Sequence, residues 1–115
     1  MGNFAFCGCS KLTKVTISNG IRTIGYSTFK DCTSLTSVTI PDSVTMIGDR
    51  VFYNCCSLIN VYCKATNPPF SCFEAFLYNA SDRKIYVPMQ SVEQYKEADG
   101  WEKYKKHIVG YDFND

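Results

Sequence analysis

A set of apolar positions recurs along this chain at an interval of 23 residues. The middle unit, residues 29–51, reads FKDCTSLTSVTIPDSVTMIGDRV. Its apolar positions have counterparts 23 residues earlier and 23 residues later: Phe6, Cys9, Leu12, Val15, Ile17, Ile21 and Ile24, then Phe52, Cys55, Leu58, Val61 and Cys63. A fixed period of this size is typical of stacked repeats, in which each unit buries its apolar side chains against its neighbours. The pattern therefore predicts a repeat solenoid.

Each unit contains one predicted strand. The alternating triplet Val-Thr-Ile, at 15–17 and again at 38–40, has period two and is rich in β-branched residues. Strands one period apart are expected to stack in parallel and in register, each supplying its neighbour's hydrogen-bond partners. Turn residues follow each strand, and a second apolar pair returns the chain across the unit. We expect the recurring Gly25 and Gly48 to occupy a bend that no side chain would tolerate.

The third unit departs from the period. A turn at 64–70 contains Pro68-Pro69, and beyond it the pattern slips by one residue, since Phe76 follows Phe52 by 24. A fourth strand is predicted over 84–87. Pro88 is expected to end the sheet there, because proline suits an edge strand and blocks further pairing.

The C-terminal residues predict helices. Ser91 with Gln94 three residues later matches a capping box, Gly100 interrupts the helix, and Trp101, Tyr104 and Ile108 mark a second short helical face. Tyr95 and Trp101 are the expected covers for the last repeat. The sequence thus predicts a leucine-rich-repeat-like solenoid of short parallel β-strands in about four rungs over residues 1–90. A small helical C-terminal cap over residues 91–115 completes one structural domain.

The sequence begins in the middle of a repeat unit, because Met1 and Gly2 align with Ile24 and Gly25. We therefore expect this chain to be the C-terminal piece of a longer protein whose targeting segment lies upstream. Its N-terminal end would then lack a covering repeat, so self-association through that end is a further expectation.

The unit from Phe29 to Gly48 resembles the BspA-type leucine-rich repeat, and the tail from Ile85 to Gly110 is similar to the closing segment of such proteins from gut Bacteroidales. Cys63 in place of isoleucine and Asn79 in place of cysteine depart from the repeat without disturbing the fold. The resemblance implies an extracellular or bacterial cell-surface protein with a non-catalytic role in adhesion or protein binding. Its partner would be a host extracellular-matrix protein or another bacterial surface protein. The alternative is a structural spacer and end-cap with no ligand of its own.

Net charge and hydropathy restrict the classes of partner that this chain can be expected to bind. The chain has 12 basic and 11 acidic residues, so it lacks the basic excess of proteins that bind nucleic acid or anionic membranes. The longest apolar run is too short to span a bilayer. A protein is therefore the expected partner, with no nucleic acid and no membrane span in this chain.

Seven cysteines are the strongest candidates for chemistry. Cys9, Cys32 and Cys55 share one repeat position, so stacking would space their Cβ atoms by about 4.8 Å, wider than the roughly 3.8 Å that a disulfide prefers. Buried free thiols are favoured over disulfides. No C-x-x-C pair suggests a metal site, and His107 lies in the predicted cap, remote from this column. We predict no catalytic residue, metal or cofactor; a thiol-dependent enzyme or metal site is the least favoured hypothesis.

The candidate binding surface is the outward face of the strands. If Val15 and Ile17 point inward, the intervening residues point outward and form two columns: Lys14, Ser37, Asn60 and Lys84, then Thr16, Thr39, Tyr62 and Tyr86. Solenoids commonly bind partners on such a regular surface, and tyrosines often anchor interfaces. The competing interpretation is that threonine and tyrosine are ordinary exposed strand residues.

Overall fold

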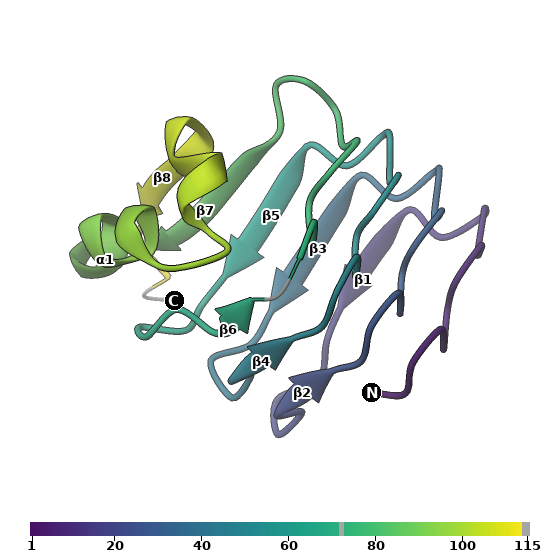
Figure 1. Ribbon diagram of the computed structural model, residues 1–115, viewed down its shortest axis with the longest axis horizontal. Coiled ribbons are helices and arrows are strands. Elements are labelled where there is room, and N and C mark those ends of the chain that lie inside the picture. Colours follow the sequence, from purple (N-terminus) through teal and green to yellow (C-terminus); the bar gives the residue numbers. More distant parts are fainter. Residues whose placement is uncertain (72, 114–115) are drawn as a thin grey trace.

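The chain winds into coils that lie one on another as a repeat solenoid with two opposite β-walls (Figure 1). The computed structural model describes residues 1–71 and 73–113. The larger wall is a parallel sheet in the order β1 (Lys14–Thr16), β3 (Ser37–Ile40), β5 (Asn60–Cys63), β7 (Lys84–Pro88) and β8 (Ile108–Tyr111). The smaller wall is parallel too, in the order β2 (Thr23–Ile24), β4 (Met46–Ile47) and β6 (Phe70–Ser71). The predicted stacking of short parallel strands is confirmed, whereas the second sheet was not predicted.

The strand register follows the sequence period, including its slip. Ile40 of β3 pairs with Cys63 of β5 at an offset of 23, but Met46 of β4 pairs with Phe70 of β6 at an offset of 24. The additional residue therefore enters between Cys63 and Phe70, in the turn that holds Pro68-Pro69. This is the location that the sequence predicted.

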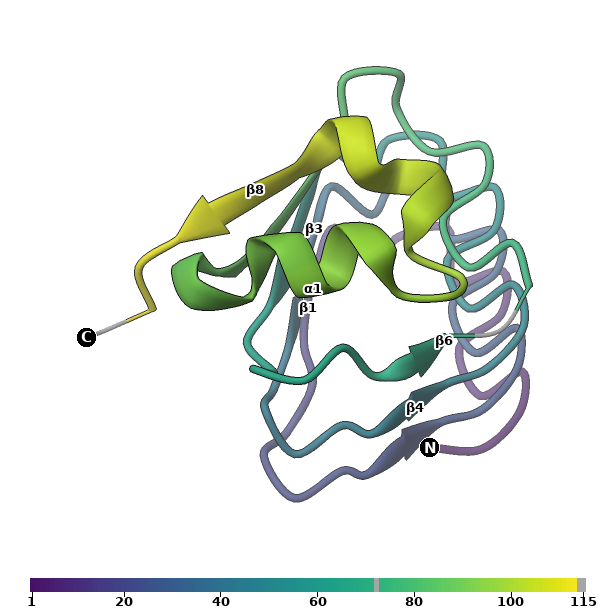
Figure 2. The same ribbon diagram turned by 60° about the vertical axis from the view of Figure 1, so that its left-hand side comes forward.

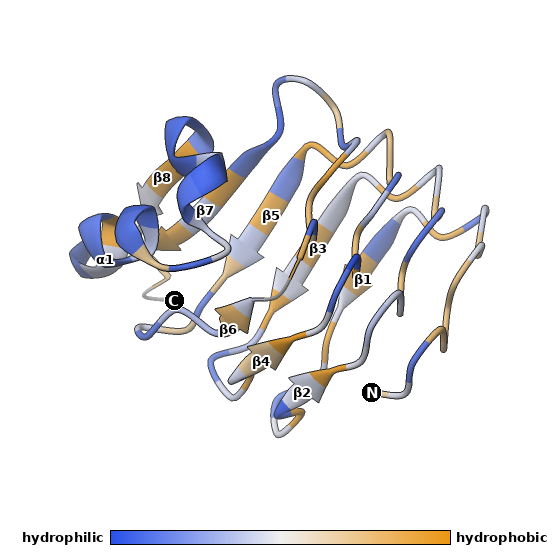
Figure 3. Ribbon diagram, in the orientation of Figure 1, coloured by the Kyte–Doolittle hydropathy of each residue, from blue (hydrophilic) through white to orange (hydrophobic). Residues whose placement is uncertain are grey.

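The space between the walls is filled by columns of identical or similar side chains. Hydrophobic and hydrophilic residues alternate along the large strands (Figure 3), and the inward residues Val38, Val61 and Ile85 are completely buried. Four phenylalanines form one column with ring centroids 5.4, 5.5 and 5.6 Å apart and planes within 10° of parallel: Phe6, Phe29, Phe52 and Phe76. Each repeat therefore buries its apolar residues against the next.

Two residues per repeat adopt left-handed backbone conformations in the turn around the phenylalanine column. One position is Phe4, Ser27, Arg50 and Glu74, and the other is Gly8, Asp31, Asn54 and Tyr78, with φ between 54° and 74°. Such a conformation costs an L-residue about 1–2 kcal/mol. Hydrogen bonds between coils offset this cost, among them Phe29 N to Val51 O at 3.0 Å and Asp31 N to Tyr53 O at 2.9 Å.

The repeated glycines Gly25 and Gly48 allow close contact between coils. Neither has a positive φ, so the expected special bend is not the reason for glycine. A Cβ atom at Gly48 would lie 2.6 Å from Tyr26 N and 2.9 Å from the Gly25 carbonyl carbon of the preceding coil. These positions exclude side chains because backbone passes directly over backbone.

The C-terminal segment packs across the open end of the last coil (Figure 2). It contains the 3-10 helix Met89–Ser91, α1 (Val92–Glu97) and the 3-10 helix Glu102–His107. Tyr95 and Trp101 are completely buried, as predicted. They donate hydrogen bonds to the carbonyl oxygens of Ala65 and Pro69, at 2.6 and 2.8 Å.

The predicted capping box at Ser91 does not form. Ser91 precedes α1 but makes no capping bond, because its hydroxyl donates instead to the Thr66 carbonyl oxygen at 2.7 Å. The side chain thus joins the C-terminal segment to the solenoid.

The predicted helical conformation at Ile108 is wrong, as is the expectation that Pro88 ends the sheet. Ile108–Tyr111 forms β8, which pairs in parallel with β7 and aligns Tyr111 with Pro88. Pro88 lacks a backbone N–H, but it occupies the last position of β7. The preceding residues of β7 keep their N–H groups and can pair with β8. The segment Met89–His107 is therefore a crossover between two parallel strands.

We predict that Gly48→Ala lowers the free energy of unfolding by about 1–3 kcal/mol, because the new methyl group must separate two coils. Urea unfolding measures the change. Gly2→Ala is the matched control, since a Cβ at Gly2 meets nothing within 4 Å and should leave stability nearly unchanged. Equal effects of the two substitutions would contradict the close-contact explanation.

Candidate binding face

The structure places the eight predicted binding residues in two rows on the outward side of the large sheet. Register pairing joins Lys14, Ser37, Asn60 and Lys84 in one row, and Thr16, Thr39, Tyr62 and Tyr86 in the other. In β3, β5 and β7 these residues alternate with completely buried neighbours, whereas Val15 between Lys14 and Thr16 in β1 is half-buried. Lys14, Thr16 and Lys84 are exposed, and the other five are half-buried. Their role in binding remains a prediction.

Three tyrosines pack together at one end of this face. Tyr62 and Tyr86 stack with ring centroids 4.9 Å apart and planes at 14°. Tyr111 of β8 packs its ring at a steep angle against both, with centroids at 5.5 and 5.4 Å. These three residues are called the tyrosine cluster below. It forms an aromatic surface that spans β5, β7 and β8.

Tyr111 was missed by the sequence analysis because Ile108 was assigned to a helix. The signal that would have identified β8 is the run Ile108-Val109-Gly110-Tyr111, which contains two β-branched residues and an aromatic one. Tyr111 is 43% exposed and its ring lies 4.8 Å from that of Phe113. Tyr111 is thus an accessible part of the candidate face.

The tyrosine cluster carries hydroxyl groups that can form hydrogen bonds. Burial raises the pKa of Tyr62, and the neighbouring phenols of Tyr86 and Tyr111 add to the increase. Lys84, beside Tyr86 along β7, supplies an exposed positive charge. The face therefore offers aromatic contact, hydroxyl groups and a flanking positive charge.

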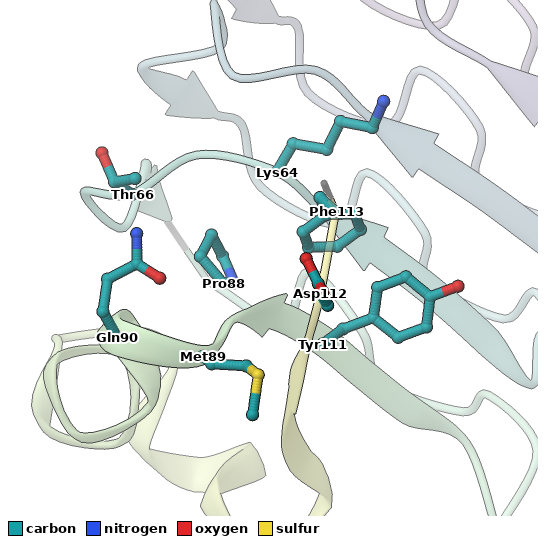
Figure 4. Close-up of a pocket in the computed structure, with 8 residues that line it drawn as sticks. All are labelled: Lys64, Thr66, Pro88, Met89, Gln90, Tyr111, Asp112 and Phe113. Atoms are coloured by element: carbon teal, nitrogen blue, oxygen red, sulfur yellow. The ribbon is translucent and has the colours of Figure 1, made fainter. Parts of the chain in front are cut away.

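A shallow pocket of about 300 Å³ adjoins the cluster (Figure 4). Of the residues that line it, Tyr111 and Phe113 come from β8 and the residues after it, and Met89 and Gln90 come from the 3-10 helix after β7. The complete lining is Lys64, Thr66, Pro88, Met89, Gln90, Tyr111, Asp112 and Phe113. This mixture of apolar and polar groups is suited to a protruding side chain of a partner protein.

The cysteine column has a structural role that the sequence analysis did not foresee. The thiols of Cys32 and Cys55 donate hydrogen bonds to the carbonyl oxygens of Phe6 and Phe29 in the preceding coil, at 3.1 and 3.0 Å. Asn79 occupies the same repeat position, and its Nδ2 donates to Phe52 O at 2.9 Å. Both residue types therefore satisfy the same backbone acceptor, which explains why asparagine can replace cysteine here.

The buried thiols are poorly suited to nucleophilic chemistry. Burial raises the pKa of Cys55 to about 12 and that of Cys63 to about 11, so both are protonated at neutral pH. Cys7, Cys9, Cys32, Cys55, Cys56 and Cys63 are free cysteines. Cys72 lies outside the described residues.

Within residues 1–71 and 73–113, no group of three or more His, Cys, Asp or Glu residues could hold a metal ion. No helix in those ranges has the length and apolar character needed to cross a bilayer. His107 is half-buried at the end of the second 3-10 helix.

A family model described as the BspA type leucine-rich repeat region matches residues 1–97, in 6 copies. The matched region extends from the first coil through α1. A search of curated proteins found no match.

We predict that part of the stability contributed by Cys55 is lost in alkali. The unfolded thiol ionises near its ordinary pKa of 9.0, whereas the folded thiol holds its proton until about pH 12. Between these values the folded state binds more protons than the unfolded state, so unfolding becomes easier as pH rises.

Urea unfolding from pH 8 to 11 should show the stability of the wild type falling toward that of Cys55→Ala. Cys56→Ala, which removes an exposed thiol from the next position, is the control. A constant difference between the wild type and Cys55→Ala across this range would contradict the assigned burial of Cys55.

Proposed function

Because the chain belongs to the BspA-type leucine-rich repeat family, we propose that it is a non-catalytic protein-binding or adhesion module of a bacterial cell-surface or secreted protein. The outward face of the large sheet is the binding surface, and the tyrosine cluster is its anchor. The partner is another protein, from the host extracellular matrix or from a bacterial surface. The site requires no cofactor.

The tyrosine cluster is the observation that carries this proposal. Tyrosine provides a large, rigid contact area at a small cost in conformational entropy, and its hydroxyl can bond to a partner. Tyr62 and Tyr86 occupy positions where earlier coils have Thr16 and Thr39. Since threonine serves the fold at this position, the change to tyrosine supports a role in recognition.

The non-catalytic assignment is supported by the chemistry of the buried cysteines. The raised pKa values of Cys55 and Cys63 leave their thiols neutral, and both side chains are completely buried. A catalytic thiol instead needs access to substrate and a lowered pKa.

A second candidate function is structural. In this alternative, the coils of residues 1–90, about four in number, are a spacer in a longer repeat protein, and residues 91–115 are its end-cap. It is favoured by the way the C-terminal segment completes the hydrogen bonds of the last coil. Tyr104 Oη accepts from Phe76 N at 3.2 Å, and Ser91 Oγ donates to Thr66 O at 2.7 Å.

A binding screen against host extracellular-matrix proteins and bacterial surface proteins distinguishes these functions. We expect a saturable interaction that Tyr62→Ala/Tyr86→Ala weakens at least tenfold, because truncating interface tyrosines typically removes a large part of the affinity. Tyr111→Ala should weaken the same interaction, since its ring completes the cluster.

The matched control is Tyr26→Ala/Tyr78→Ala, which removes two tyrosines that are 48% and 60% exposed and lie outside the large sheet. Thermal unfolding verifies that each variant remains folded. Binding that is lost equally in the control would argue against the proposed face. If the folded wild type binds nothing in the screen, the spacer and end-cap function replaces the binding function.

A further inference from the structure

The tyrosine cluster lies between two exposed lysines on the outward face of the large sheet. Along β7, Lys84 and Tyr86 face outward and Pro88 follows two residues later. Lys84 is therefore on one side of the tyrosines. Lys64 is on the other side, because it directly follows β5 and lines the shallow pocket together with Pro88. The distance along β7 from Lys84 to Pro88 is about 13 Å, at roughly 3.3 Å per residue.

The charges on this face are mainly positive. The strands of the large sheet, as the structure describes them, contain Lys14 and Lys84 and neither aspartate nor glutamate. Asp42 and Asp112 lie beyond the strand ends, where each lines a hollow together with Lys64. Within residues 1–71 and 73–113, Lys64 and Lys84 form no salt bridge, and both are exposed. Their ammonium groups are therefore available to a partner.

The hydroxyl groups of the tyrosine cluster are also available as donors. The hydroxyls of Tyr95 and Tyr104 form hydrogen bonds inside the fold. Those of Tyr62, Tyr86 and Tyr111 form none with another residue in the part of the chain that the structure describes. Together with the two ammonium groups, they give the face many donors. A ligand with carboxylate and carbonyl oxygens complements this arrangement.

The pocket beside the cluster can accept an apolar side chain of the same ligand. Its volume is about 300 Å³, and Met89 and Tyr111 in its lining are 66% and 43% exposed. A methionine side chain adapts its shape to the group that it contacts. Lys64 borders the same pocket (Figure 4). The pocket therefore suits an aliphatic or aromatic side chain that has a carboxylate close beside it.

We propose that the tyrosine face binds an extended, acidic segment of the partner protein in which acidic residues flank an apolar residue. This inference rests on the proposed function, since it assigns a partner chemistry to the same face. The apolar side chain enters the pocket beside Met89 and Tyr111. One carboxylate meets Lys64 next to the pocket, and another meets Lys84 across the tyrosines. An extended chain covers that distance of about 13 Å with four residues.

Two other occupants fit the face less well. A sulfated polysaccharide also carries anionic groups, but it has no apolar side chain for the pocket. A second copy of this chain that bound through the same face would bring Lys64 and Lys84 of each copy toward the same charges of the other. An acidic segment avoids this repulsion and fills the pocket. Both alternatives are outcomes of the test.

Titration of the isotopically labelled chain with the peptide Ser-Glu-Ser-Glu-Leu-Glu-Ser-Glu-Ser tests the proposal. One analogue replaces every glutamate by glutamine, and another replaces the leucine by serine. We expect amide shifts centred on Tyr62, Tyr86 and Met89. The glutamate peptide should bind roughly fivefold more tightly than the glutamine analogue at low salt, and about 1 M salt should remove this difference. The analogue without leucine should bind more weakly than the parent peptide.

Charge reversal provides a second readout. Lys64→Glu/Lys84→Glu should invert the preference, so that a peptide with lysine in place of glutamate binds more tightly than the glutamate peptide. Lys11→Glu/Lys14→Glu is the matched control, because it makes the same change in net charge at exposed lysines of the first coil. This control should leave the preference unchanged. Thermal unfolding verifies that both variants remain folded.

The acidic ligand and the tyrosine face fail in different ways. Suppose that a partner from the binding screen is lost by Tyr62→Ala/Tyr86→Ala but binds Lys64→Glu/Lys84→Glu as tightly as it binds the wild type. The tyrosine face then stands, and the acidic segment is wrong. Equal binding of the glutamate and glutamine peptides, or no binding of either, also overturns the acidic segment.

Two further results would assign the face to another occupant. The first is a heparin oligosaccharide that displaces the glutamate peptide and binds more tightly than it does. The second is light scattering that shows a dimer at the titration concentration, which Tyr62→Ala/Tyr86→Ala dissociates. A sulfated polysaccharide would be the ligand in the first case, and a second copy of the chain in the second.

Discussion

Direct contact between consecutive backbones is the constraint on which this solenoid depends. Gly48 lies against Gly25 and Tyr26 so closely that even a methyl group would intrude. This close contact between backbones aligns hydrogen bonds from coil to coil and brings equivalent residues into columns. The parallel phenylalanine rings follow from it, as do the thiol-to-carbonyl bonds of Cys32 and Cys55. One backbone spacing thus determines the core, the buried polar contacts and the rows on the surface.

The two ends of such a stack pose different physical problems. At the C-terminal end, the last coil presents both apolar side chains and backbone N–H and C=O groups. Apolar contact alone would leave these backbone groups without hydrogen-bond partners. Tyr95, Trp101 and Tyr104 meet both needs, because each joins a large apolar ring to a hydrogen-bonding group. In the first coil, Phe6 is 41% exposed, whereas Phe29 in the same column is 1% exposed.

Elements that a recurring pattern marks could be predicted from the sequence, whereas elements that form only through contacts with other parts of the fold could not. The 23-residue period predicted four of the strands of the large sheet, and the 24-residue offset between Phe52 and Phe76 predicted the slip. The two-residue strands of the smaller sheet are too short to show alternation. The left-handed turn residues are chemically diverse, since Arg50 and Glu74 share one position, so no residue type marks it. β8 was missed because it forms through pairing with β7, while the preceding residues suggested a continuing helix.

Departures from the repeat fall into two physical classes. Inward departures are explained by new contacts at the C-terminal end: Cys63 Sγ lies 3.3 Å from Tyr95 Oη, and Asn79 Oδ1 accepts from Arg83 Nε at 3.2 Å. Outward departures are different, because the fold constrains those positions only to suit an exposed strand. The change from threonine to tyrosine at Tyr62 and Tyr86 belongs to this second class. The periodic core therefore preserves the scaffold, while outward positions are free to vary from coil to coil.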